Sequence, residues 1–495
     1  MNHASPLIDN PMSGIAAIIA LGIGAQWLAW RLRVPSILLL LVTGFIAGPL
    51  TGWLNPEAVL GDLLFPIVSV SVGLILFEGG MSLRISELRE IGAAIRNLIL
   101  FGIPLTWLMI SAAAAHFLGF DLQLSILFGA LLVVTGPTVV LPLLRYLRPV
   151  GHVGSILKWE GILNDPVGAT FAVLVLESIL PDHPSHGMLG GVVRTLLIGS
   201  LLGYLSTRIL VALMSRYWIP DFLQAAVTLM AVVSAFTLSN IIQEESGLLT
   251  VTVMGVVLAN QKSVAVKHIL EFKENLRVLL ISCLFIILAA RLELSALEGV
   301  DWGGGFLFLA VLILVVRPLA VFLSTAGTSL TWQEKLFVSW MAPRGIVAAA
   351  VASLFSMRLI DMGYPGAEKL VPVTFLIIVG TITVYGLTAY PLGLWAKVTS
   401  TKAQGVLMVG AHLWARKIGE VLSNEGFPVL LADTNRGNVN AARMAGLPTF
   451  FGNILAESSL EKLNLDGIGR MLAVTANDEA NSLASLHFAE VFDRS

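Results

Sequence analysis

Apolar segments long enough to cross a lipid bilayer recur with little interruption from the N-terminal region to Trp395. A bilayer core about 30 Å thick requires roughly 20 apolar residues in a helix. About thirteen windows meet this requirement, near residues 12–30, 36–53, 63–81, 97–118, 122–144, 155–180, 188–213, 221–242, 246–260, 276–291, 303–325, 333–357 and 370–396. Because backbone groups in lipid must be hydrogen-bonded internally, the sequence predicts an α-helical polytopic membrane protein.

Composition supports this class and excludes others. Hydrophobic residues make up 56% of the chain and charged residues 13%, which a soluble globular domain of ordinary composition does not show. A formal net charge of -2 argues against nucleic acid as a partner, because such proteins concentrate Lys and Arg on one face. Cys283 is the only cysteine, so the chain has no internal disulfide.

Loop charges predict the orientation in the membrane. Basic residues gather in alternate loops, at positions such as Arg31, Arg84, Arg145 and Lys262, whereas the intervening loops are acidic. By the positive-inside rule the basic loops are cytoplasmic, and an odd number of spans then leaves the N-terminus outside. We expect a multi-pass protein of a bacterial inner (plasma) membrane, with its first span, 12–30, retained.

The character of the chain changes after Lys402. Short apolar strand patterns at 405–410, 428–433, 449–451 and 471–475 alternate with helical segments, the first of them 413–425. This alternation is typical of a parallel α/β sheet. The predicted organisation is a membrane domain at 1–398, a linker at 399–404 and a cytoplasmic Rossmann-like domain at 405–495. The last domain stops after four strand-helix units, one or two fewer than usual, so we expect it to be incomplete or cut.

Two of the spans contain residues that break helices. The fifth reads Thr135-Gly136-Pro137-Thr138, and the twelfth reads Pro343-Arg344-Gly345. Irregular backbone at membrane depth persists only where protein or a hydrated cavity satisfies it. Paired interruptions in corresponding spans point to an inverted-repeat transporter, here two six-helix repeats around a linking helix. A simple proline kink is the alternative for either break alone.

Charged side chains inside spans single out the sixth span. Each costs about 2.5–3.5 kcal/mol to insert and therefore needs a partner or a function. Asp165 lies between Asn164 and Pro166, and we expect it to bind the transported ion while Asn164 orients the carboxylate. Glu160 is five residues away and so faces another side of the helix.

The remaining intramembrane charges have supporting roles. Arg317 and Arg344 need counter-charges, and Glu160 is the expected partner. Arg344 is also well placed to compensate the carbonyl ends of half-helices, which carry partial negative charge. Glu78, near the inner end of the third span, is either a snorkelling or capping residue or a ligand.

The expected chemistry is competition at one carboxylate. An alkali cation requires oxygen ligands, which Asp165, Thr135, Thr138 and freed carbonyls supply, while a proton neutralises the same carboxylate. Exchange of one proton for one cation is electroneutral. A gated channel would instead require a carbonyl filter or an acidic ring, which the sequence lacks. No histidines occur at metal-ligand spacing, so an enzyme is not expected.

Together these motifs resemble the monovalent cation:proton antiporter superfamily, in its sodium/proton exchanger branch that includes the NhaP proteins, over residues 12–397. They are Phe77-Glu-Gly-Gly80, Glu160 with Asn164-Asp165-Pro166, Arg317-Pro318 and Arg344-Gly345. The resemblance implies that Asp165 binds ion and proton, that Glu160 bridges to Arg317 and that Thr135 is a ligand. It also implies a homodimer with an elevator motion of the core bundle.

Two departures from the family pattern affect selectivity. Gly136 stands where the family often has aspartate, and Gly161 where serine is common. Both remove oxygen ligands, so the resemblance does not carry over a choice between sodium and potassium.

The tail resembles the TrkA N-terminal (RCK) nucleotide-binding type. Gly410, His412 and Ala415 stand at the positions of the G-x-G-x-x-G fingerprint, and Asp433 ends the second strand, suited to a ribose. His412 replaces a glycine that admits a pyrophosphate. Either a regulatory nucleotide such as AMP, ATP or NAD binds here, or the domain is ligand-free and structural. Such a tail also suits a nucleotide-regulated potassium efflux system.

Overall fold

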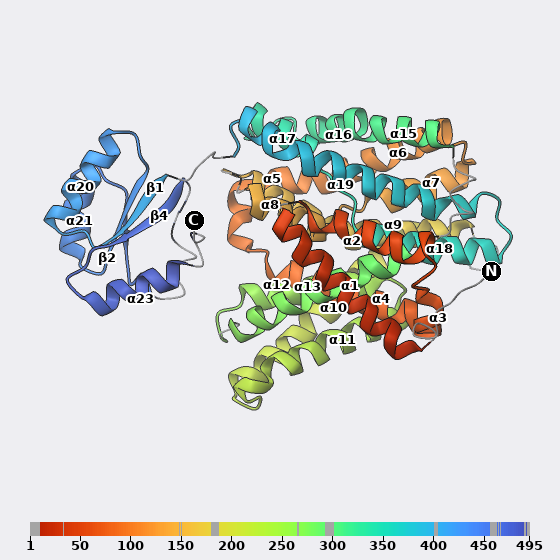
Figure 1. The fold of residues 1–495 in the computed structure, drawn as a ribbon, viewed down its shortest axis with the longest axis horizontal. Coiled ribbons are helices and arrows are strands. Elements are labelled where there is room, and N and C mark those ends of the chain that lie inside the picture. Colours follow the sequence, from red (N-terminus) through yellow and green to blue (C-terminus); the bar gives the residue numbers. More distant parts are fainter. Residues whose placement is uncertain are drawn as a thin grey trace. The chain divides into compact units, whose positions relative to one another are not determined.

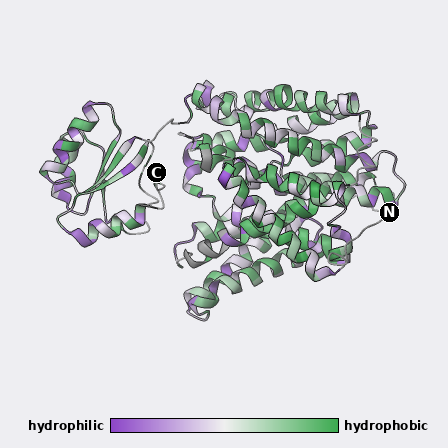
Figure 2. Cartoon of the chain, in the orientation of Figure 1, coloured by the Kyte–Doolittle hydropathy of each residue, from purple (hydrophilic) through white to green (hydrophobic). Residues whose placement is uncertain are grey.

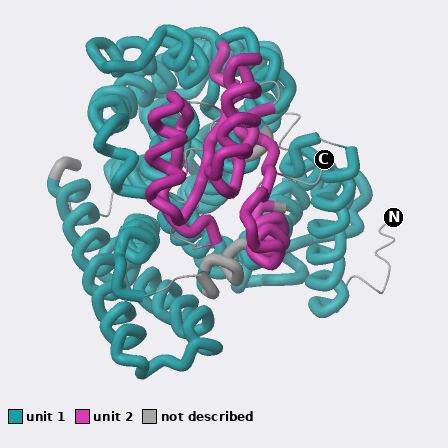
Figure 3. Tube along the Cα trace, turned by 90° about the vertical axis from the view of Figure 1, so that its left-hand side faces the viewer, with its two compact units in different colours: residues 1–147, 151–396 teal, residues 148–150, 397–495 magenta. Residues whose placement is uncertain are grey.

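The computed structural model describes residues 10–492 except 33, 148, 150, 180–187, 265–266, 293–300, 400–403, 456–462, 464, 466 and 490–491. The chain forms two compact units (Figure 3). Unit 1 comprises Met1–Leu147 and Gly151–Ala396, and unit 2 comprises Arg148–Val150 and Lys397–Ser495. The predicted linker, 399–404, lies mostly outside the described residues.

Unit 1 is a bundle of apolar helices (Figures 1 and 2). The helices that carry the spans are α1 (Pro11–Leu32), α2 (Ser36–Phe45), α3 (Pro56–Leu60), α4 (Leu64–Met81), α5 (Leu88–Asn97), α6 (Ile103–Phe117), α7 (Leu122–Val133), α8 (Pro137–Leu147), α9 (Val153–Ile179), α10 (Met188–Ser215), α11 (Gln224–Ile242), α12 (Ser246–Asn260), α13 (Lys267–Ala290), α15 (Trp302–Val311), α16 (Arg317–Ser324), α17 (Trp332–Trp340), α18 (Ile346–Asp361) and α19 (Leu370–Trp395).

Each predicted span coincides with helix. Among the described residues, nine helical segments have the length and hydropathy to cross a membrane, and one of them, Leu122–Leu144, runs across the break between α7 and α8. Three further spans are shorter apolar helices, Ser36–Leu50, Ser246–Asn260 and Asn275–Ala290. The twelfth span is divided into two helices, α17 and α18, and neither is long enough to be one of the nine segments. The prediction of a polytopic helical membrane fold is confirmed.

Two further spans change their helical geometry at a proline. One π-helical turn, Leu98–Gly102, joins α5 to α6, and another, Leu312–Val316, joins α15 to α16. Pro104 and Pro318 follow these turns, and a proline has no N–H to continue the α-helical hydrogen bonding. These spans are the fourth and eleventh, the same spacing as the broken fifth and twelfth. The second turn brings Arg317 to the start of α16.

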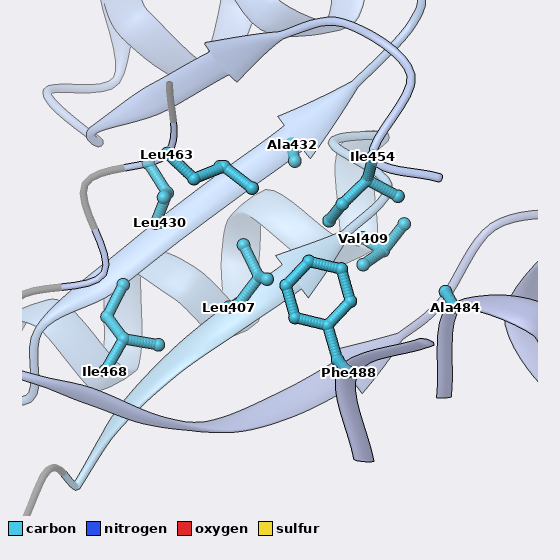
Figure 4. Close-up of a cluster of buried hydrophobic side chains, with 9 residues drawn as sticks. All are labelled: Leu407, Val409, Leu430, Ala432, Ile454, Leu463, Ile468, Ala484 and Phe488. Atoms are coloured by element: carbon cyan, nitrogen blue, oxygen red, sulfur yellow. The ribbon is translucent and has the colours of Figure 1, made fainter. Parts of the chain in front are cut away.

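Unit 2 contains a parallel sheet of β1 (Gly405–Val409), β2 (Val429–Asp433), β3 (Thr449–Phe451) and β4 (Ile468–Ala473), in the order β3-β2-β1-β4. Its helices are α20 (Leu413–Asn424), α21 (Arg436–Met444) and α23 (Asp478–Ala489). Alternate side chains of the strands enter different apolar cores. Phe488 of α23 packs with Leu407 and Val409 on one face of the sheet (Figure 4), and Ala415 of α20 packs with Met408 and Leu431 in the other core. The predicted parallel α/β domain is confirmed, although β4 begins three residues earlier than expected.

Candidate ion site at the crossing of two broken helices

The two breaks meet in unit 1. The first is extended chain between α7 and α8, and the second is extended chain between α17 and α18. The Gly136 N–H donates to the Pro343 carbonyl at 3.1 Å. A Cβ at Gly345 would stand 2.5 Å from the Gly136 Cα, which no real Cβ tolerates. Glycine is therefore required on both sides of the crossing, and the aspartate usual in the family would not fit at 136 in this conformation.

Arg344 satisfies the carbonyl end of α7. Its Nη1 donates to the carbonyls of Val133 and Val134, at 3.2 Å each, and its side chain is buried. The last carbonyls of a helix have no intrahelical partner and carry partial negative charge, so a buried guanidinium stabilises them. The hydrogen-bond partners of Arg344 are thus backbone carbonyls, whereas the sequence predicts Glu160 as its counter-charge.

Glu160 of α9 and Arg317 of α16 form a bidentate ion pair. Arg317 Nη1 donates to Glu160 Oε1, and Nη2 donates to Oε2 at 2.8 Å. Nη2 also donates to the carbonyls of Val338 and Met341, near the end of α17. Both charged side chains are at most 7% exposed, so the pair links three segments around the crossing where water does not compete.

Asn164 and Asp165 lie in the middle of α9, and Asn164 contacts the first break. Asn164 Nδ2 donates to Thr135 Oγ1 at 3.2 Å, which fixes the amide toward the broken segment. Asp165 is completely buried, and neither of its carboxylate oxygens has a hydrogen-bond partner in the described part of the chain. Asn164 Oδ1 is likewise without a partner there. Three buried acceptor atoms are therefore available to a cation or a proton donor.

One cavity brings together half of the predicted membrane-site residues, and Asp165 is not among those that line it. It measures about 10 Å³ and is lined by Thr135, Glu160, Asn164, Arg317 and Arg344, among others. Thr138 lines a different cavity, together with Glu78 of α4. Thr135 and Thr138, on either side of the first break, therefore line different cavities, and Asp165 lines neither of them.

Glu78 has a charged partner that the sequence did not predict, Arg277. Arg277 of α13 approaches Glu78, with its Nη1 3.0 Å from Oε1. The sequence offers one signal for it, because Arg277 lies near the start of the apolar part of α13, Asn275–Ala290, and an intramembrane charge needs a counter-ion. Gly80 has a packing role, since a Cβ at this position would stand 2.5 Å from the Thr252 carbonyl oxygen of α12.

The predicted nucleotide residues of the tail surround the end of β1. Gly410 has a φ of +110°, which favours glycine, and His412 precedes α20 as its N-cap residue. Asp433 accepts hydrogen bonds from the Ala411 N–H at 2.8 Å and from Asn438 Nδ2 at 2.9 Å. Partial burial raises the pKa of Asp433, but hydrogen bonds from Asn435, Ala411, Asn438 and Thr434 outweigh it and hold the pKa below its usual value.

Comparison with known proteins decides the family. Residues 15–395, more than half of the chain, match the family model described as "sodium/hydrogen exchanger, transmembrane". The chain belongs to the sodium/hydrogen exchanger family. It is thus a transporter rather than an enzyme. Residues 406–494 match the TrkA-N domain, a nucleotide-binding fold.

Individual relatives agree with this assignment. The chain is 28% identical over 400 residues to the K(+)/H(+) antiporter NhaP of Alkalimonas amylolytica, covering 79% of this chain and 67% of that protein. It is 27% identical over 352 residues to the Na(+)/H(+) antiporter 1 of Methanocaldococcus jannaschii, covering 69% and 82%.

Solved structures give the same fold. The sodium proton antiporter MjNhaP1 from Methanocaldococcus jannaschii at pH 8 superimposes with a TM-score of 0.69 at 24% identity, covering 77% of this chain and 98% of that one. An electron-microscopy structure of the same antiporter gives a TM-score of 0.64.

Proposed function

We propose that this chain exchanges Na⁺ or K⁺ for H⁺, one for one, with the cation and the proton competing for Asp165. The observation that carries the proposal is a fully buried carboxylate whose two oxygens have no hydrogen-bond partner among the described residues. An ionised carboxylate in such a place is costly unless a cation or a proton neutralises it. Occupation by one excludes the other, and this exclusion couples the two fluxes.

The surrounding oxygens complete the cation shell. Asn164 Oδ1 is adjacent in sequence and without a partner in the described chain, and Thr135 Oγ1 is held toward Asn164. Thr138 begins the second half of the broken span, and its hydroxyl lines the second cavity together with Glu78. Hard alkali cations prefer such carboxylate, amide and hydroxyl oxygens. Residue 164 is an asparagine and not a second carboxylate, so it adds no negative charge to the site. This favours electroneutral exchange.

The identity of the cation follows from no single residue. The relatives named above include a K(+)/H(+) antiporter and an Na(+)/H(+) antiporter, at nearly equal similarity. We therefore retain both ions. The broken helices support alternating access, in which each protomer of a homodimer moves its core bundle like an elevator against a dimerisation domain. The N-terminus then lies outside, and the tail lies in the cytoplasm of a bacterial cell.

The tail is proposed to regulate transport by binding a nucleotide such as AMP, ATP or NAD. The TrkA-N match and the position of Asp433 at the end of β2 support this. The same match favours a second candidate function, a nucleotide-regulated potassium efflux system.

Proton movement in proteoliposomes tests the exchange. Purified protein is reconstituted with an internal pH dye, and sodium, potassium or lithium is added in turn. We expect a dye response to sodium or potassium that Asp165→Asn abolishes. Asp121→Asn is the matched control, because it removes a carboxylate that caps α7 outside the crossing. A response that persists in Asp165→Asn would refute the proposed mechanism.

A further inference from the structure

An intramembrane ion pair lies outside the crossing. Arg277 and Glu78 are joined at 3.0 Å, and their side chains are 12% and 6% exposed. Removing two charges from water costs several kcal/mol per ion, so a buried pair is weak evidence for stability by itself. The cavities around the pair therefore indicate what the pair does.

The pair borders two cavities. One, of about 10 Å³, is lined by Glu78, Gly79, Arg277 and the start of α8, including Thr138. The Thr138 hydroxyl has no hydrogen-bond partner in the described part of the chain. This space is about what one water molecule occupies, and hence also suits one dehydrated alkali cation. A second cavity, of about 30 Å³, lies between α4, α11 and α13 and is lined by the same pair.

Thr138 connects the pair to the crossing. Its Oγ1 lies 3.3 Å from where a Cβ of Gly345 would stand. An ion beside Thr138 and Glu78 is thus next to the broken segments that carry the proposed site. Glu78 lies three residues before the end of α4, at the end that precedes the basic residues Arg84 and Arg89. The expected approach to this cavity is therefore from the cytoplasmic face.

We propose that Arg277 is a positioning residue that competes with the transported cation for Glu78. With no cation present, the guanidinium pairs with the carboxylate. When a cation enters the cavity beside Thr138, the Glu78 carboxylate pairs with the cation and no longer with the Arg277 guanidinium. Because the cation must displace Arg277, binding is weakened and release is eased, as conduction through any ion pathway requires. This inference rests on the proposed function and adds a determinant of affinity to it.

Cation affinity at the cytoplasmic face tests the idea. In oriented proteoliposomes, Arg277→Gln should lower the half-saturating concentration of sodium or potassium at least threefold, because a competitor for Glu78 is removed. Arg277→Lys, which keeps the charge, should stay close to wild type. In the Glu78→Gln background, Arg277→Gln should have no further effect on affinity.

Arg291→Gln is the matched control. Arg291 directly follows α13 and is also ion-paired, with Nε 2.7 Å from Glu57 Oε1, but it does not line the cavity that contains Thr138. Its removal should leave affinity at the cytoplasmic face unchanged. An affinity gain of the same size in this control would show a general charge effect and overturn the proposal.

Thermal stabilisation by sodium or potassium provides a readout without transport. Ligand binding raises stability in proportion to ln(1 + [L]/Kd), so Arg277→Gln should be stabilised at lower cation concentration than wild type. An unchanged or weaker affinity by both methods overturns the role of Arg277. If Asp165→Asn also retains exchange, the proposed function itself fails. If Asp165→Asn is silent, only the competition fails.

Discussion

Glu160→Met should destabilise the membrane unit strongly, because it leaves the Arg317 guanidinium buried without its counter-charge. Glu160 accepts two hydrogen bonds from Arg317, and both side chains are almost excluded from solvent. Removing one partner of such a pair costs about 3–5 kcal/mol. At about 2 °C per kcal/mol for a large domain, the apparent Tm should fall by about 6–10 °C.

Removing both charges separates this effect from lost packing. Glu160→Met/Arg317→Met should cost less than the sum of the two single variants, because the second change deletes a charge that has lost its partner. It should not regain wild-type stability, since the carbonyls of Val338 and Met341 each lose a hydrogen bond from a charged donor, worth about 1.5–3 kcal/mol. Tryptophan-fluorescence melting of detergent-solubilised protein at one heating rate measures this. A Tm decrease below about 2 °C for Glu160→Met, or strictly additive effects, would refute the reasoning.

Three other outcomes follow from the same contacts. Gly136→Ala should prevent the two breaks from meeting and abolish exchange in the dye assay, whereas Gly24→Ala, which meets no neighbouring atom in the described chain, should have no effect. Arg344→Gln should lower the Tm, because the Val133 and Val134 carbonyls lose a charged donor worth about 1.5–3 kcal/mol; a wild-type Tm would show that water replaces it. Asp433→Asn in the intact chain should weaken stabilisation by NAD, ATP or AMP in a melting assay, and unaltered stabilisation would argue against a ribose contact.

Several features of the site were predictable because each follows from a local rule. Gly136 with Pro137, and Pro343 with Gly345, cannot continue a helix in lipid, so both breaks were visible in the sequence. An arginine partner for Glu160 was also expected, because buried charges of opposite sign need each other, and the family resemblance implied Arg317 in particular.

Other features depend on which helices become neighbours. Arg277 and Glu78 are separated by 199 residues and meet only because α4 packs against α13. The partners of Arg344 are backbone carbonyls of α7, which carry no sequence signal of their own. The need for glycine at both 136 and 345 likewise arises from an approach between two distant segments.

The sequence by itself determined the membrane class, the two broken spans, the α/β tail and a list of intramembrane charges, because hydrophobicity, helix breaking and strand alternation act over a few neighbouring residues. Only the tertiary structure decided how those charges are distributed. It assigned Glu160 to Arg317 and Glu78 to Arg277, and it left the Asp165 carboxylate without a hydrogen-bond partner in the described residues. The physical reason is that charge pairing acts at about 3 Å, a distance set by helix packing and not by separation along the chain.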